Sequence, residues 1–186
     1  MNIKTRFFVL VLATATAAGA LATPAAQADD NFRFSLTGRI VRVADGDTVT
    51  LLDESKQQHR IRLANIDAPE TGKGKDKPGQ PYSQQAREAL ATMVAGKHLT
   101  AQCYEKDHYG RSICVLPYGS SSANREMVAQ GMAWAYAAAR GRYLRDKSLL
   151  DVERAARSER QGIWREANPT PPWEWRNVCW KQRQCK

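Results

Sequence analysis

Alternating apolar and polar residues predict five strands along the chain. The first runs from Phe34 to Val43, and its alternation is broken at Val41, so we expect a bulge or burial on both faces near that residue. Turn residues separate this strand from the next, and a helical pattern interrupts the series after the third strand. The remaining predicted strands are Thr48–Leu52, His59–Ile66, His98–Glu105 and Ser112–Tyr118.

Apolar residues at helical spacing predict three helices. The first begins with Ser83 as its N-cap and ends at Gly96, the second spans Ser122–Gln130, and the third spans Arg145–Arg160 and stops at Gly162. Five strands with an inserted helix favour a small closed barrel, because closure removes exposed sheet edges. The expected fold class is therefore α+β, mainly a β barrel. The residues expected on buried helix faces are Ala86, Leu90, Met93 and Val94, and Leu149, Leu150, Val152 and Ala156.

The two ends of the chain differ from its middle. Lys4 and Arg6 precede an apolar, alanine-rich run, and Ala26-Gln27-Ala28 has the pattern of a signal-peptidase site. We predict a signal peptide over residues 1–28 and a secreted or periplasmic protein; a transmembrane anchor is the alternative, disfavoured because the run is short. Residues 29–166 form the expected domain. Residues 167–186 form a Pro-rich link and a basic tail with Trp and Cys.

Four cysteines lie in the predicted mature chain, and an even number in an exported protein favours disulfides. Three pairings are open. We favour Cys103–Cys114 and Cys179–Cys185, because the members of each pair are close in sequence. A metal site of Cys103, His108 and Cys114 is the alternative, but its spacing fits no common zinc pattern.

Length and charge limit the classes of function that this chain can have. The 186 residues exclude a multidomain enzyme, and 28 Lys and Arg against 19 Asp and Glu give a net charge of +9. This charge suits a polyanionic partner, although it also serves solubility. Lys73 and Lys75 stand in a Gly- and Pro-rich segment, residues 72–81, that we expect to be a mobile loop. They either gather phosphate or keep the loop solvated.

Three turn-like segments bring together the groups that phosphodiester cleavage needs. Each is ordinary alone, but together they supply carboxylates, a base and guanidinium groups. Asp47 and Asp67 offer the oxygen ligands that a hard divalent cation prefers. Glu70 could position or deprotonate a water molecule. Arg62 and Arg111 match the negative charge that develops on the phosphate.

The motifs D-G-D-T-V-T-L (45–51), R-L-A-N-I-D-A-P-E-T (62–71) and D-H-Y-G-R (107–111) resemble those of the staphylococcal nuclease (thermonuclease) family. The order and spacing agree over roughly residues 36–164. The resemblance implies a five-stranded OB-fold barrel and a Ca²⁺-dependent endonuclease, with other divalent cations as alternatives. It implies DNA and RNA as substrates. We also expect a monomer, and no membrane association of the mature form, because no later segment could span a bilayer.

The resemblance also implies roles for individual residues. Asp47, Asp67 and the backbone carbonyl of Ala68 would hold the metal, with Asp45 as a secondary partner. Glu70 would be the general base, and Arg62 and Arg111 would contact the scissile phosphate. Two departures are His108, where the family commonly has Lys, and Ala68, where it commonly has Thr. The residues expected to bind substrate are His108, Tyr109, Tyr136, Lys73 and Lys75.

A non-catalytic OB-fold module that binds single-stranded nucleic acid is the alternative function. The acidic residues argue against it, because carboxylates repel phosphate unless a cation intervenes. A secreted structural or adhesion protein is a more distant alternative. The tail carries Trp173, Trp175 and Trp180 among basic residues. These side chains either pack on the barrel, with Cys179–Cys185 fixing the end, or add a grip on nucleic acid.

Overall fold

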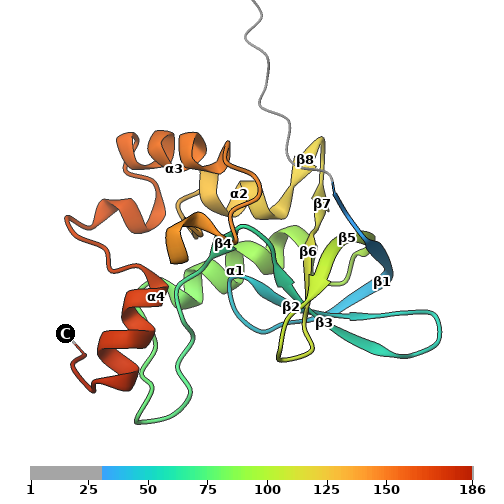
Figure 1. Ribbon diagram of the computed structural model, residues 1–186, viewed down its shortest axis with the longest axis horizontal. Coiled ribbons are helices and arrows are strands. Elements are labelled where there is room, and N and C mark those ends of the chain that lie inside the picture. Colours follow the sequence, from blue (N-terminus) through green and yellow to red (C-terminus); the bar gives the residue numbers. More distant parts are fainter. Residues whose placement is uncertain (1–30, 186) are drawn as a thin grey trace, which may run out of the picture.

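The computed structural model describes residues 31–185, and a five-stranded closed barrel is its centre (Figure 1). The predicted signal peptide lies outside the described residues. Within the barrel, β3 and β6 pair in parallel and the other neighbours are antiparallel, with β1 and β5 closing the ring. The strand order is β1 (Phe34–Val43), β2 (Thr48–Leu52), β3 (Gln58–Leu63), β6 (Ser112–Val115) and β5 (His98–Lys106).

Strand β1 has the predicted bounds and the predicted irregularity. Its register with β2 shifts between Ile40 and Arg42, which confirms the bulge. Ile40 is buried whereas the next residue, Val41, is 45% exposed. Gly38 allows β1 and β2 to approach, because a Cβ there would lie 2.3 Å from the carbonyl oxygen of Leu52.

Helix α1 (Ser83–Val94) covers the barrel core, and the four side chains predicted to be buried on it are buried. The prediction that Ser83 is the N-cap is wrong. Tyr82 occupies that position with a φ of 65°, and the chain turns there because Ser83 N–H donates to the carbonyl of Gln80. The helix ends before Gly96, whose φ of 72° confirms its role in the turn.

The predicted third and fifth strands are each divided. Strand β3 ends at Leu63, and Asn65, with a φ of 67°, redirects the chain into β4 (Ile66–Asp67). Strand β4 pairs with β9 (Trp134–Ala135) outside the barrel. After β6, the short strands β7 (Pro117–Tyr118) and β8 (Ser121–Ser122) form a hairpin.

Helix α2 (Ala123–Ala129) follows the prediction, with Ser122 accepting a hydrogen bond from the N–H of Arg125. Helix α3 (Leu149–Ser158) begins four residues later than predicted. The reason is that Arg145 and Asp146 donate their N–H groups to the side chain of Asn65 instead of entering the helix.

The inner face of α3 also differs from the prediction. Leu149 and Ala156 are buried, and Val152 is half-buried, but Leu150 is 40% exposed. Glu153 is buried because its carboxylate accepts a hydrogen bond from the N–H of Ala135. Gly162 does not stop α3, which ends before Glu159. Gly162 instead begins the turn η2 (Gly162–Arg165).

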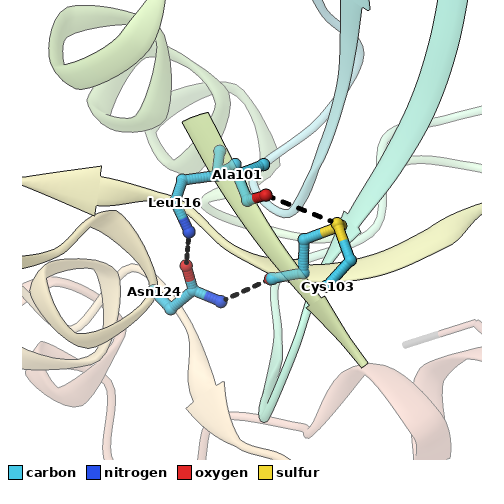
Figure 2. The surroundings of a disulfide bond; sticks show 5 residues. Ala101, Cys103, Leu116 and Asn124 are labelled. Carbon is cyan, nitrogen blue, oxygen red and sulfur yellow. Dashed lines mark hydrogen bonds between the residues drawn. A yellow bond between two sulfur atoms is a disulfide. The ribbon is translucent and has the colours of Figure 1, made fainter. Parts of the chain in front are cut away.

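Both predicted disulfides are present. Cys103–Cys114 links β5 to β6, and the neighbouring Asn124 of α2 ties the helices to the barrel (Figure 2). The Asn124 side chain accepts from the N–H of Leu116 and donates to the carbonyls of Cys114 and Ala64. This contact fixes the end of β3 immediately before the segment that carries Asp67.

The C-terminal segment contains elements that the sequence did not predict. The helical turns α4 (Pro172–Trp175) and η3 (Arg176–Lys181) precede the second disulfide, Cys179–Cys185. This segment lies beside the loop between β4 and α1 (Figure 1). Trp175 and Trp180 each donate their indole N–H to the carbonyl of Pro78, at 3.3 and 3.0 Å. Trp175 and Trp180 therefore pack on the 72–81 loop, whereas Trp173 packs against Tyr136 and the cluster that contains Trp134 and Trp164.

Two further features complete the described chain. The short turn η1 (Ala139–Gly141) lies between β9 and α3. Among the helices of residues 31–185, none has the length and apolar character needed to cross a membrane.

Candidate active site

A cavity of about 920 Å³ opens where β2, β3, the 107–111 turn and the C-terminal segment meet. Its lining contains most of the residues that the sequence singled out. Asp45, Asp47, Arg62, Glu70 and Arg111 all contribute to its wall. The three motifs, separate in sequence, therefore form one site.

The D-G-D turn before β2 supplies the first acidic pair. The N–H of Asp47 donates to Asp45 Oδ1 at 3.0 Å, and Asp47 accepts further hydrogen bonds from the Thr48 hydroxyl and the N–H of Ala68. Gly46 lets this turn approach its neighbours, because a Cβ would lie 2.7 Å from that of Ala68. The turn and the 67–70 segment are thus held in direct contact.

Arg62, at the end of β3, neutralises two acids at once. Its Nη1 contacts Asp47 Oδ2, and its Nη2 donates to Asp67 Oδ1 at 2.6 Å. Burial lowers the pKa of the Arg62 guanidinium. The negative charges of Asp47 and Asp67 raise it by more, so the pKa lies above the ordinary value. Arg62 is charged at any working pH and lines the cavity.

Arg176 is the functional residue that sequence analysis missed. Its Nη1 donates to Glu70 Oε1 at 2.5 Å and to Asp67 Oδ1 at 3.2 Å, and its Nη2 donates to Asp67 Oδ2 at 2.8 Å. The sequence showed it only as one of several basic residues in the tail. No local spacing signals a contact across more than 100 residues.

The acidic residues differ in their proton affinity. Burial, followed by the negative charge of Asp47, raises the pKa of Asp45 to about 7. Burial opposes ionisation of Asp47 as well, but Arg62 and the N–H of Ala68 outweigh it and lower its pKa. Burial raises the pKa of Glu70, and Arg176 offsets part of that effect. A carboxylate with a raised pKa beside a cavity suits a proton acceptor.

The 107–111 turn forms another part of the cavity wall. Asp107 accepts the N–H groups of Tyr109 and Arg111 and pairs with the Arg111 guanidinium at 2.8 Å. Partial burial raises the pKa of Asp107, but these donors and the Arg111 charge lower it overall. The ring centroids of His108 and Tyr109 lie 3.7 Å apart, and both residues line the cavity. Arg111 lies at the site without contacting the acids around Arg62.

The other predicted substrate-binding residues are only partly brought together. Tyr136 lines the cavity and stacks on Tyr143, with ring centroids 5.9 Å apart. Lys73 also lines it, with its Nζ 3.9 Å from Glu70 Oε2. Lys75 is exposed on the loop and does not line the cavity, so the structure does not bring it together with the other residues.

The donor set suits a hard cation but is engaged by guanidinium groups. Within residues 31–185, no group of three or more His, Cys, Asp or Glu side chains is arranged to hold a metal ion. The physical reason is that Arg62 and Arg176 cover Asp67, which is fully buried and does not line the cavity. Asp45, Asp47, Asp67 and Glu70 nevertheless outnumber the two guanidiniums. Their carboxylate oxygens are the kind of ligand that a hard divalent cation prefers.

Comparison with known proteins gives a consistent result. Residues 60–166 match the family model described as "Staphylococcal nuclease homologue". The chain is 38% identical over 141 residues to an "Uncharacterized endonuclease" of Escherichia coli O157:H7, covering 75% of this chain and 84% of that protein. It is 36% identical over 153 residues to a "Micrococcal nuclease" of Shigella flexneri, covering 76% and 80%.

A plant protein shows the same similarity over a shorter stretch. The "Staphylococcal-like nuclease CAN1" of Arabidopsis thaliana is 36% identical over 120 residues, which cover 64% of this chain and 34% of that protein. The family match covers more than half of the chain and includes Arg62, Asp67, Glu70 and Arg111. Together with the five-stranded barrel, these matches show that the chain belongs to the staphylococcal nuclease family.

Proposed function

We propose that this protein is an exported, metal-dependent endonuclease that hydrolyses phosphodiester bonds of DNA and RNA with little sequence specificity. The observation that carries the proposal is the shared cavity of Asp47, Glu70, Arg62 and Arg111. A phosphate-binding wall of two guanidiniums beside a carboxylate base suits hydrolysis better than binding alone. The names of the relatives, endonuclease and micrococcal nuclease, support the same activity.

The residues divide the chemistry among them. Asp47, Asp67 and the Ala68 carbonyl would hold Ca²⁺, with Asp45 nearby. When bound, the cation supplies charge that polarises a phosphate oxygen. Glu70 accepts a proton from the attacking water while the water oxygen bonds to phosphorus and the bond from phosphorus to the leaving oxygen breaks. Arg62 and Arg111 donate hydrogen bonds to the phosphate oxygens as negative charge grows on them.

The aromatic side chains around the cavity support a broad substrate range. Tyr136, Tyr143 and Tyr109 line it, and Tyr109 is 70% exposed. Bases of any identity can stack on such rings, because every base has a π-face. His108, where the family commonly has Lys, lines the same cavity. We therefore infer that single-stranded or frayed segments are accepted with weak sequence preference.

Export is supported by two independent features. The signal-like residues 1–28 address the chain to a secretory route. The two disulfides, Cys103–Cys114 and Cys179–Cys185, suit an oxidising compartment. We infer a periplasmic or extracellular enzyme that acts as a monomer.

The test is an assay of residues 29–186 with single- and double-stranded DNA and RNA, first with Ca²⁺ and then with chelator. Cleavage that requires Ca²⁺ is expected. Glu70→Gln should lower the turnover by about 10²–10⁴, the range for losing a general base. Substrate binding should change little in this variant, because the phosphate contacts remain.

The opposite result would point to the alternative function. Binding without cleavage, whichever divalent cation is added, would leave a non-catalytic OB-fold module. Cleavage by Glu70→Gln at the wild-type rate would remove Glu70 from the role of base while leaving the nuclease activity established.

A further inference from the structure

The C-terminal segment places a guanidinium between the two acids on which the proposed reaction depends. Arg176 contacts Asp67 with both terminal nitrogens and Glu70 with one of them. Asp67 is fully buried, and the side chain of Glu70 is 14% exposed. This contact is therefore different from an exposed surface ion pair, which contributes little and tolerates many geometries.

Arg176 is not needed to attach the segment. The indole N–H groups of Trp175 and Trp180 donate to Pro78, and Gln80 donates to the carbonyl of Thr170 at 2.5 Å. The disulfide Cys179–Cys185 then closes the turn that carries Trp180. With these anchors on both sides, the position of Arg176 is fixed by the backbone around it.

The two carboxylate oxygens of Glu70 have different partners. Oε1 is held by Arg176 at 2.5 Å, whereas Lys73 Nζ lies 3.9 Å from Oε2. One oxygen is thus fixed and the other faces no close donor among the described residues. A base held in this way has a defined orientation toward a water molecule in the cavity.

We propose that Arg176 is a positioning residue that orients Glu70 and releases Asp67 when a divalent cation binds. The inference rests on the proposed nuclease function. Arg176 stands over the Asp67 oxygens that a cation needs, and its charge repels that cation. It therefore favours catalysis through Glu70 and opposes cation binding through Asp67. These two effects have opposite signs, which an ordinary structural role does not produce.

The experiment compares Arg176→Ala and Arg176→Lys with the wild type in the mature chain. Ca²⁺ binding is measured by calorimetry without nucleic acid, and kcat and KM are measured on a single-stranded oligonucleotide. For Arg176→Ala we expect kcat to fall about 10- to 100-fold, the range for residues that orient a site, with KM nearly unchanged. Ca²⁺ should bind about threefold or more tightly, because a repelling charge is gone. Arg176→Lys should recover part of kcat and weaken Ca²⁺ binding toward the wild type.

Arg183→Ala is the matched control. It removes the same charge from the same segment, but Arg183 is exposed and lies outside the cavity lining. It should leave kcat and Ca²⁺ affinity unchanged. Thermal unfolding of all variants separates a folding defect from a site effect, and Arg176→Lys retains the positive charge at this position.

Several outcomes would overturn the inference. An unchanged kcat in Arg176→Ala, with an active wild type, would remove the positioning role while leaving the nuclease function intact. A raised KM with unchanged kcat would make Arg176 a substrate contact instead. Weaker Ca²⁺ binding together with a matching loss of thermal stability would reduce its role to holding the fold. Absence of cleavage by the wild type would refute the proposed function itself.

Discussion

Arg62 Nη2 lies 2.6 Å from Oδ1 of Asp67, a carboxylate that is fully buried. The same guanidinium contacts Asp47 through its other terminal nitrogen. Two buried carboxylates therefore share one guanidinium at the end of β3, and Asp67 also contacts Arg176. Arg62 also lines the cavity, so the proposed contact with phosphate and the pairing with these acids involve the same side chain.

Arg62→Ala should therefore lower both stability and activity. Removing one partner of a buried ion pair leaves an uncompensated charge, which costs about 3–5 kcal/mol. Arg176 still contacts Asp67, so we expect the loss at the lower end of that range. Urea unfolding at neutral pH measures it. A loss below about 1 kcal/mol would contradict the assignment of Arg62 as the main counterion.

Arg111→Ala should lower activity while leaving stability nearly unchanged. Arg111 pairs with Asp107, and both side chains are partly exposed, so the free energy of unfolding should change by less than about 1 kcal/mol. Activity should fall by about 10²–10³, the range for losing one donor to the developing charge. Turnover assays and urea unfolding on the same preparation check this. Wild-type turnover in this variant would exclude Arg111 from phosphate contact.

Asp45 should give the protein an unusual dependence on pH. Its pKa rises from 3.8 in the unfolded chain to about 7 in the fold, so the folded state binds more protons between these values. The contribution of Asp45 to stability is thus present below about pH 4 and is lost as pH rises through 7, by roughly 2–4 kcal/mol. Asp45→Asn should therefore be more stable than the wild type at pH 8 in chelator.

The pH experiment has an internal control. Comparing Asp45→Asn with the wild type at pH 4 and at pH 8 isolates the titration of this residue from that of other acids. Added Ca²⁺ should reduce the difference at pH 8, because a nearby cation favours the ionised carboxylate. Equal stability of the two proteins at both pH values would show that Asp45 has an ordinary pKa.

The Cys103–Cys114 disulfide should contribute measurably to stability. It joins facing residues of β5 and β6 across 11 positions, which corresponds to about 3 kcal/mol from the restricted unfolded chain. The double variant Cys103→Ala, Cys114→Ala should therefore melt roughly 6–12 °C lower in a thermal scan. Both sulfurs are buried, so alanine avoids introducing an unpaired polar group.

Reducing conditions provide the matching control for this disulfide. Reductant should lower the melting temperature of the wild type toward that of the double variant and leave the latter's barrel transition nearly unchanged. A wild-type melting temperature insensitive to full reduction would show that the crosslink contributes nothing to the barrel.

Local patterns predicted the barrel and most of the candidate site. The bounds of β1 and β2 and the bulge near Val41 follow from alternation, which records which face is buried. The D-G-D turn and the 67–70 segment were identified because their residue types match one chemistry. Their direct contact through Ala68 N–H to Asp47 needed the fold.

The late start of α3 and the missed Arg176 share a physical cause, namely contacts between residues far apart in sequence. The start of α3 was misplaced because Asn65 takes the N–H groups of Arg145 and Asp146 from 80 and 81 residues away. Arg176 was missed because its partners are 106 and 109 residues earlier. Neither contact produces a periodic pattern of residues in the surrounding sequence.

Arg176 lies late in the sequence, so it is synthesised after the residues that it contacts. The acids contacted by Arg62 or Arg176, and Arg62 itself, lie between residues 47 and 70, so they leave the ribosome well before the segment at 172–181. A chain interrupted before that segment would contain every barrel strand yet lack the guanidinium that contacts Glu70. Under the role proposed for Arg176, such a shortened chain would fold its barrel but hydrolyse nucleic acid more slowly than the full chain.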